Sequence, residues 1–229
     1  MNFHQVFEAF NKLKVLVIGD VMLDSYVWGK VDRISPEAPV PVVHVHRREY
    51  RLGGAGNVLL NVQSLGAEAI ICTVIGNDGS GILLENSLKD KGLNCEGLIK
   101  SDERITTIKE RIIAGSQQVV RIDTETDRPI SQNEQMKLIE KVKSLIPSCD
   151  VIIFEDYDKG VLTPEAIAEI TDFANANQIP TVVDPKKRNF LAYNHVTLFK
   201  PNLKELREGL KIEFDVDNLE EVKSAAENL

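Results

Sequence analysis

Apolar runs of strand length alternate with helix-like segments along most of this chain. Five runs are almost continuously aliphatic, which is typical of strands buried on both faces of a parallel sheet. They are Lys14–Gly19, Ala69–Ile75, Val151–Phe154, Thr181–Val183 and Val196–Phe199. Because strands that alternate with helices favour a sheet covered by helices, the pattern predicts an α/β fold with a mainly parallel central sheet.

The predicted helices have recognisable ends. Ser131, with Glu134 three residues later, forms a capping box at a helix start. Thr163 and Pro164 are suited to be an N-cap and a first-turn proline. Gly92 is suited to end the helix predicted over residues 80–91. These signals place helices between the aliphatic runs.

Two stretches interrupt this alternation. Residues 26–31 and 40–46 have strand-like patterns on either side of the proline-rich segment RISPEAP. Residues 106–113 and 118–123 predict a hairpin that turns at residues 114–116. We interpret these four strands as a small accessory sheet that serves as a lid or a dimer interface.

The last segment has an apolar stripe at helical spacing, formed by Leu219, Val222, Ala226 and Leu229. No further segment follows against which this stripe would pack. We therefore expect residues 1–229 to be the N-terminal part of a single larger domain.

Composition and charge narrow the functional classes. With 43% hydrophobic and 27% charged residues, the 229-residue chain is an ordinary globular protein. Its net charge of −8 disfavours binding to nucleic acid or to an anionic membrane surface. Its three cysteines, in no metal-binding or redox spacing, predict reduced thiols. Because no apolar stretch of about 18 residues occurs, we expect a cytoplasmic protein without a membrane span.

Polar residues follow the aliphatic runs, where ligands bind in parallel α/β sheets. They are Asp20, Asp78, Asp156, Asp184 and Asn202, with Asp24 one helical turn past Asp20. Carboxylates and an amide at one edge suit a hydroxyl-rich or metal-bearing ligand. The alternative is that each residue only caps a helix; for the whole row we favour a site.

A glycine-rich segment, Gly53 to Asn57, opens an apolar helix over residues 58–65. Glycines let backbone N–H groups approach a ligand at a helix start, although close helix packing is an alternative explanation. The motifs GxxxxGK[ST] and GxGxxG are both absent at the places where nucleotide-binding proteins of those kinds carry them.

Taken together, these motifs resemble the ribokinase-like carbohydrate kinases, and among them the heptose 7-phosphate 1-kinases of ADP-heptose synthesis. The segments that carry the resemblance are GDVMLDSYVWG (19–29), RISPEAPVPVV (33–43), GGAGNVLLNVQSLGA (53–67), DYDKG (156–160), DPK (184–186) and PNLKE (201–205). The resemblance covers about the whole chain. It implies a three-layer fold with a small β lid, and ATP-dependent phosphorylation of D-glycero-D-manno-heptose 7-phosphate at the anomeric hydroxyl.

The resemblance also implies roles for individual residues. The residues expected to hold the sugar are Asp20, Asp24, Gly53, Gly54, Asn57 and Asp156. Lys109 and Arg111, two apart on the hairpin and so on one face, are candidates for the substrate's phosphate together with Lys159. A solvated strand face is the alternative for Lys109 and Arg111.

The nucleotide side is expected to follow the last two strands. Asn202 and Glu205 match the family's NxxE motif, which orders water around Mg²⁺ beside the ATP phosphates. An N-cap and a first-turn acid is an alternative compatible with that role. Asp184 and Lys186 are assigned to the same side, with a solvated turn as the alternative for Lys186.

The catalytic aspartate of this family belongs to a GAGD motif, which does not occur in the sequence. We therefore expect the general base downstream of Leu229 and predict that the chain alone is inactive. A kinase of another sugar and a non-catalytic sugar-phosphate-binding or dimerisation module are the alternatives. A homodimer through the lid strands is expected.

Overall fold

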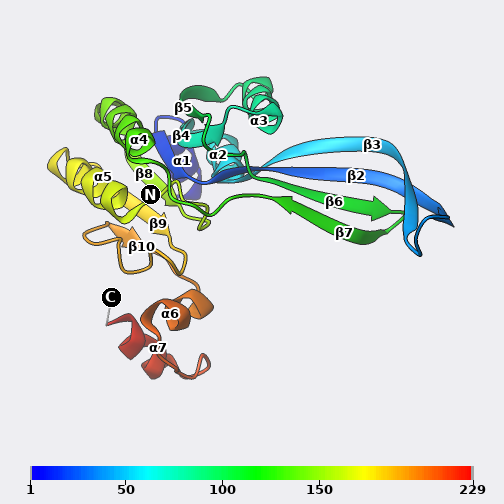
Figure 1. Ribbon diagram of the computed structural model, residues 1–229. Coiled ribbons are helices and arrows are strands. Elements are labelled where there is room, and N and C mark those ends of the chain that lie inside the picture. Colours follow the sequence, from blue (N-terminus) through cyan, green and yellow to red (C-terminus); the bar gives the residue numbers. More distant parts are fainter. Residues whose placement is uncertain (1, 228–229) are drawn as a thin grey trace.

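The computed structural model describes residues 2–227 (Figure 1). Its strands are β1 (Lys14–Gly19), β2 (Val21–Ile34), β3 (Pro41–Gly54), β4 (Glu68–Gly76), β5 (Asn94–Ser101), β6 (Ile108–Ala114), β7 (Gln117–Thr124), β8 (Val151–Glu155), β9 (Thr181–Asp184) and β10 (Leu198–Phe199). Its helices are α1 (Phe3–Phe10), α2 (Ala55–Ser64), α3 (Gly79–Asp90), α4 (Gln132–Leu145), α5 (Pro164–Ala176), α6 (Leu203–Leu210) and α7 (Leu219–Ala226), with a 3-10 turn, η1 (Ile146–Ser148).

Six parallel strands form the central sheet in the order β10-β9-β8-β1-β4-β5. The aliphatic run of β1 lies near the middle and is buried on both faces. Consecutive residues of a strand point to opposite sides, so Leu16 and Ile18 enter one core while Val15 and Val17 enter the other. The predicted α/β class and mainly parallel sheet are confirmed.

Helices cover both faces of this sheet and complete three layers (Figure 1). One face is covered by α4 and α5, through side chains that include Leu138 and Ile170. The other is covered by α2 and α3, through Leu59 and Leu84 among others. The predicted capping box of α4 and the Thr163 cap of α5 are both present.

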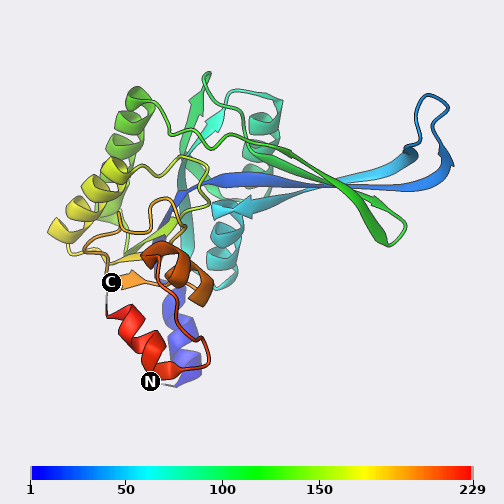
Figure 2. The same cartoon turned by 60° about the horizontal axis from the view of Figure 1, so that its bottom comes forward.

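A second sheet, formed by β2, β3, β6 and β7, projects from this body and is called the lid below (Figure 2). Only Asp20 separates β1 from β2, and β3 leads directly into α2, so the lid is continuous with the body. β2 and β3 have 14 residues each and extend beyond the predicted 26–31 and 40–46. Because β2 begins at Val21, Asp24 lies on a strand and not one helical turn beyond Asp20.

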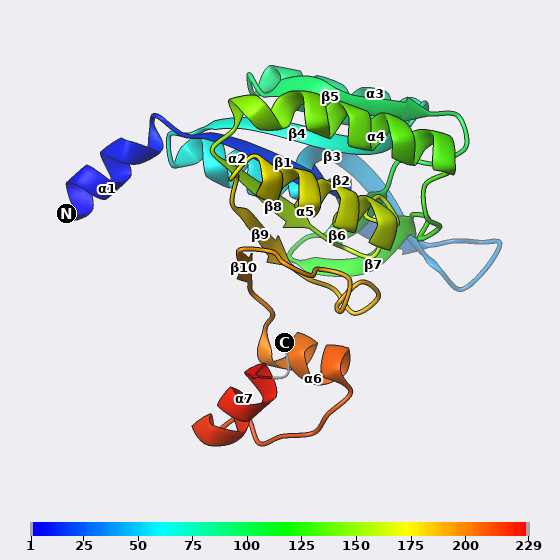
Figure 3. The same ribbon diagram turned by 90° about the vertical axis from the view of Figure 1, so that its left-hand side faces the viewer.

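The last two helices, α6 and α7, pack together beside β10 (Figure 3). Their small core contains Phe190, Leu206 and Ala225. The predicted stripe of α7 is largely uncovered within the described residues, since Leu219 is 65% exposed. Leu229 lies outside the described residues.

Three elements differ from the sequence prediction. β5 was not predicted, because polar Asn94, Glu96 and Lys100 interrupt its apolar positions at the sheet edge. α1 was not predicted either, and it buries none of its residues. β10 begins at Leu198 and not at Val196. Every helix within residues 2–227 is too short or too polar to cross a membrane.

Candidate functional site

The carboxyl ends of the inner strands meet at one edge of the central sheet. In the sheet register, Glu155 of β8 lies beside Gly19 of β1 on one side and Asp184 of β9 on the other. Asp20 and Asp156 are the next residues after Gly19 and Glu155. Three of the predicted strand-end carboxylates are therefore in one row, as expected from parallel strands.

Asp20 is turned into the protein. It is 1% exposed, and its carboxylate accepts hydrogen bonds from the backbone N–H groups of Tyr157 (2.9 Å), Lys159 (3.0 Å) and Val161 (3.0 Å). Burial raises the pKa of the Asp20 carboxyl above its ordinary value, although these three donors oppose the rise. Both oxygens of Asp20 thus anchor the loop that follows β8.

Asp156 is engaged in a similar way. Its Oδ2 accepts hydrogen bonds from the Asn189 side chain (2.9 Å) and the Tyr193 hydroxyl (2.8 Å), and its Oδ1 accepts one from the Asp158 N–H (2.9 Å). Asp78, which follows β4, caps the start of α3. Asp78 is thus a helix cap, as the alternative prediction has it, whereas Asp20 and Asp156 accept hydrogen bonds from loop residues and cap none of the described helices.

An open cavity of about 780 Å³ lies where the lid meets the body. It is lined by Asp24 from β2, Gly53 and Gly54 from β3 and Asn57 from α2. The Asp24 side chain is 21% exposed. The exposed Asn57 side chain makes no hydrogen bond to any other described residue. Four residues that the sequence assigns to sugar binding are thus gathered from three elements around one space.

Glycine is required at both positions of the turn from β3 into α2. A Cβ atom on Gly53 would lie 2.6 Å from Oδ2 of Asp24, so only glycine leaves the carboxylate in place. Gly54 has a φ of +57°, in the left-handed region that favours glycine. The following N–H, of Ala55, donates to the carbonyl of Asp20 at 2.9 Å and ties the start of α2 to the end of β1.

Arg111 of β6 contacts this cavity's carboxylate directly. Its guanidinium donates to Oδ1 of Asp24 at 2.6 Å and lies 5.3 Å from the centre of the Tyr26 ring. Arg51 lies over the same ring at 4.7 Å. Lys109 and Arg111 do share one face of β6, but their side chains are only 18% and 22% exposed, so this face is not freely solvated.

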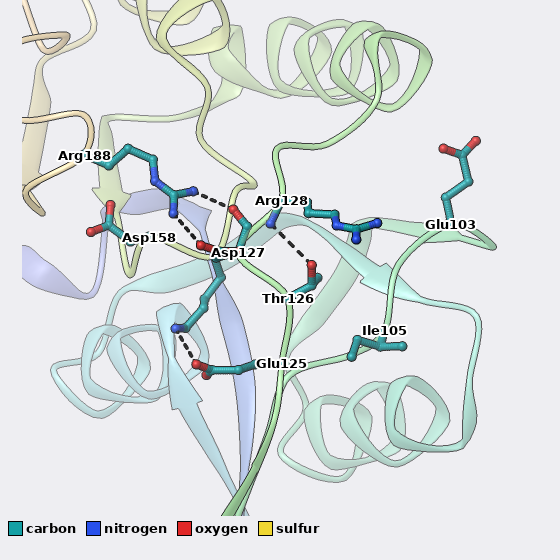
Figure 4. Close-up of a pocket in the computed structure, with 9 residues that line it drawn as sticks. Glu103, Ile105, Glu125, Thr126, Asp127, Arg128, Asp158 and Arg188 are labelled. Carbon is teal, nitrogen blue, oxygen red and sulfur yellow. Dashed lines mark hydrogen bonds and ion pairs between the residues drawn. The ribbon is translucent and has the colours of Figure 1, made fainter.

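Lys109 and Lys159 meet around one carboxylate. Glu125 accepts a hydrogen bond from Nζ of Lys109 at 2.8 Å and from Nζ of Lys159 at 2.9 Å. Lys109 also pairs with Asp123 at 3.0 Å. Glu125 and Lys159 border a second cavity, of about 670 Å³, whose other charged lining includes Arg188 (Figure 4).

Besides Glu125, two charged residues of this region were not predicted from the sequence. Arg104, in a loop without periodic pattern, donates to the backbone carbonyls of Arg128 (2.9 Å) and Lys159 (2.6 Å). Glu155 is 7% exposed, and its carboxylate has no hydrogen-bond partner within residues 2–227. Burial and the neighbouring Asp184 raise the pKa of Glu155 to about 7. Its place at the end of a predicted strand was the signal that pointed to it.

The predicted nucleotide side lies after β9 and β10. Asn202 and Glu205 form a capping box at the start of α6, with N–H to side-chain distances of 2.9 and 2.8 Å. Lys186 forms an ion pair with Glu205. Asp184 lies 3.4 Å from Lys200 through one oxygen, whereas its Oδ1 is buried without a partner among the described residues.

These residues are suited to a hydrated magnesium ion more than to a bare one. Among residues 2–227, no group of three or more His, Cys, Asp or Glu side chains is arranged to hold a metal directly. Mg²⁺ usually keeps several waters in protein sites. The unpartnered Oδ1 of Asp184 and the carboxylate of Glu205 are acceptors of the kind that bind such waters.

Residues 12–229 match the sequence profile described as pfkB family carbohydrate kinase. The chain belongs to this family. The predicted resemblance to carbohydrate kinases is thereby confirmed. The family also supports a sugar kinase as the broad class of activity.

Several curated relatives are also similar to the chain. The bifunctional protein HldE of Citrifermentans bemidjiense is 45% identical over 199 residues, which are 87% of this chain and 41% of the relative. HldE of Geotalea uraniireducens is 40% identical over 224 residues, which are 98% of this chain and 45% of the relative. The chain thus spans less than half the length of these relatives.

Solved structures share the fold at low sequence identity. The tetrameric inhibited form of phosphofructokinase-2 from Escherichia coli has a TM-score of 0.71 and 18% identity, covering 94% of this chain and 69% of its own. Arabidopsis thaliana ribokinase, in complex with ribose and ATP, has a TM-score of 0.66 and 14% identity, covering 94% and 68%. The predicted ribokinase-like fold is confirmed by these likenesses.

Proposed function

We propose that this chain binds D-glycero-D-manno-heptose 7-phosphate for ATP-dependent phosphorylation at the anomeric hydroxyl, which yields the 1,7-bisphosphate for ADP-heptose synthesis. The main support is the cavity at the lid–body junction, where Asp24 and Asn57 face one space beside two glycines. Sugars require such hydrogen-bond acceptors and donors. The motifs RISPEAPVP and DYDKG, and the similarity to bifunctional HldE proteins, favour the heptose over other sugars.

In this proposal the sugar hydroxyls bind to Asp24 and Asn57. Arg111 occupies Oδ1 of Asp24, which leaves Oδ2 as the acceptor for a hydroxyl. Arg111 is thus a positioning residue for Asp24. Asp20 and Asp156 would contribute through the loop after β8, which they hold with their own hydrogen bonds.

The ATP phosphates are assigned to the side of Asp184, Lys186, Asn202 and Glu205. Lys186 supplies positive charge there, and Glu205 and Asp184 would bind waters of Mg²⁺. A Mg²⁺ ion held there would supply positive charge that neutralises the negative charge developing during phosphoryl transfer. The chain's own part is to hold the acceptor sugar and the nucleotide at the same edge of the sheet.

The general base is not supplied by these residues in our proposal, because the GAGD motif is absent from the sequence. The base would take the proton of the anomeric hydroxyl, whose oxygen then attacks the γ-phosphorus and displaces ADP. Losing a general base typically costs about 10²–10⁴-fold in rate. We expect the 229-residue chain to release no ADP above background in a coupled assay with ATP, Mg²⁺ and heptose 7-phosphate; sugar-dependent turnover would contradict this.

We also propose a homodimer through the face of the lid that carries three exposed apolar side chains. Val45, Val120 and Ile122 lie on the same face as the buried Val27, and they are 53%, 47% and 47% exposed. Light scattering is expected to show a dimer that Val120→Glu converts to a monomer. Leu191→Glu, a control at a 66% exposed leucine away from the lid, should remain dimeric. A strictly monomeric parent chain at high concentration would refute the dimer.

Calorimetric titration with heptose 7-phosphate tests the sugar site. Asp24→Asn is expected to weaken binding at least about tenfold, because charge-assisted hydrogen bonds are the strong ones. Asp90→Asn is the matched control, since Asp90 is an exposed acid on the rim of the same cavity. Equal affinities for the parent chain and Asp24→Asn would overturn the assignment of the cavity.

A further inference from the structure

A cluster of charges outside the sugar cavity is centred on Glu125. One carboxylate bridges two ammonium groups from different parts of the fold, Lys109 on β6 and Lys159 in the loop after β8. The side chains of both lysines are 18% exposed, and that of Glu125 is 29% exposed. A carboxylate between two lysines has the same contacts that a phosphate group would make there.

Each of the two lysines has one attachment that does not involve Glu125. The backbone of Lys159 is fixed on both sides, since its N–H donates to Asp20 at 3.0 Å and its carbonyl accepts from Arg104 at 2.6 Å. Nζ of Lys109 has a second partner in Asp123, at 3.0 Å. If Glu125 moved away, Lys109 would keep its bond to Asp123 and the backbone of Lys159 would keep its position, so both ammonium groups would remain within reach of an anion.

Glu125 itself is placed where it can move. It is the first residue after β7, in the segment 125–131 that belongs to no helix or strand. Together with Lys159 it lines the 670 Å³ cavity shown in Figure 4, which has room for a phosphomonoester. Partial burial alone would raise the pKa of the Glu125 carboxyl, but the hydrogen bonds from Lys109 and Lys159 outweigh it, so the pKa lies below its ordinary value.

We propose that Glu125 occupies the binding place of the substrate's phosphate and is displaced by it. The inference rests on the proposed function and adds how the site selects a phosphorylated sugar. A dianionic phosphomonoester replaces a single carboxylate charge between the lysines, and the freed carboxylate turns to solvent. An unphosphorylated sugar has no group that can do so, and Glu125 therefore determines specificity for phosphomonoesters.

Inorganic phosphate is a direct probe, because it tests the lysine pair without the sugar cavity. Titration of the parent chain and of Glu125→Gln, followed by calorimetry and phosphorus NMR, is expected to show phosphate binding about tenfold tighter in the variant, since the competing charge is gone. Glu103→Gln, which removes an acid from the same cavity that is not bonded to the lysines, should bind as the parent chain does. Adding Lys159→Gln to Glu125→Gln should abolish the gain.

Unchanged phosphate affinity in a folded Glu125→Gln protein would overturn the inference, as would an equal gain in Glu103→Gln. These measurements distinguish a failure of the role of Glu125 from a failure of the proposed function. If heptose 7-phosphate binds the parent chain and Glu125→Gln equally, the role of Glu125 is refuted while the kinase substrate stands. If phosphate binding tightens but heptose 7-phosphate binds no better than phosphate, the role of Glu125 stands and the heptose is refuted.

Discussion

Asp20 and Asp24, four residues apart in one motif, have opposite environments. Asp20 directly follows the buried strand β1 and is 1% exposed, and its oxygens accept hydrogen bonds from three backbone N–H groups. Asp24 lies on β2, where the lid leaves the body, and lines an open cavity with one oxygen bonded to Arg111. One aspartate holds the protein's own loop and the other is available to a ligand.

The contrast between the two residues indicates which carboxylates are free to bind a ligand. A carboxylate directly after a fully buried strand is surrounded by backbone donors of the neighbouring loops, and an unpaired carboxylate there would be costly. A carboxylate at the junction of two sheets has neighbours on one side only. Asp20 and Asp156, in the row of acids at the edge of the central sheet, therefore bind donors of the protein, whereas Asp24 of the lid faces the cavity.

The largest expected effect is that of Asp20→Asn. The amide cannot accept from all three N–H groups and places its own N–H₂ against donors, so we expect the free energy of unfolding to fall by about 3–5 kcal/mol. Urea denaturation monitored by circular dichroism measures it. Asp32→Asn, on an exposed part of β2, is the control and should change the free energy of unfolding by less than about 0.5 kcal/mol. A loss below about 1 kcal/mol for Asp20→Asn would contradict the anchoring role.

Glu155 is a third kind of acid: it is buried, and no donor within residues 2–227 bonds to its carboxylate. Its pKa of about 7 in the folded protein exceeds the ordinary 4.5 of the unfolded chain. The folded state therefore binds the proton more tightly, and parent stability falls as pH rises through this window. Groups that face Glu155 include Asp184, which adds to the rise, and Lys186 and Lys200, which oppose it.

Glu155→Gln removes this pH dependence, because glutamine resembles the protonated acid. We expect the variant to exceed the parent's free energy of unfolding by up to about 3 kcal/mol at pH 8 and to equal it near pH 4.5. Denaturation series at several pH values measure the difference. Glu37→Gln, in the exposed tip of the lid, should follow the parent at every pH. A constant offset for Glu155→Gln would show that packing and not ionisation is responsible.

Most of the fold was predictable because its strands are buried on both faces. A segment such as Val15–Ile18 has no polar position, so its pattern does not depend on knowing its neighbours. β5 was not predicted, for the opposite reason. It is an edge strand with polar Asn94 and Lys100, and it has a neighbouring strand on only one side. The lid strands were found but shortened, because β2 and β3 are paired with each other beyond the body by polar as well as apolar residues.

The sequence indicated which residues belong to the site better than it indicated which atoms they contact. Glycine spacing located Gly53 and Gly54, since those positions tolerate no side chain. Nothing in the sequence distinguished Asp20 from Asp24, because burial of a carboxylate depends on loops 130 and more residues away. The same limit hid Glu125 and Arg104, whose partners come from other elements.

The smallest effect concerns the ion pair between Asp24 and Arg111, whose side chains are 21% and 22% exposed. Partly exposed pairs contribute little to stability, so a double-mutant cycle of Asp24→Asn and Arg111→Gln should give a coupling of about 1 kcal/mol or less in the free energy of unfolding. The same variants should both lose affinity for heptose 7-phosphate, because Arg111 orients the carboxylate that binds the sugar. If Asp24→Asn instead destabilised the protein as much as Asp20→Asn, Asp24 would be a second anchor of the fold. The two aspartates would then not differ in role.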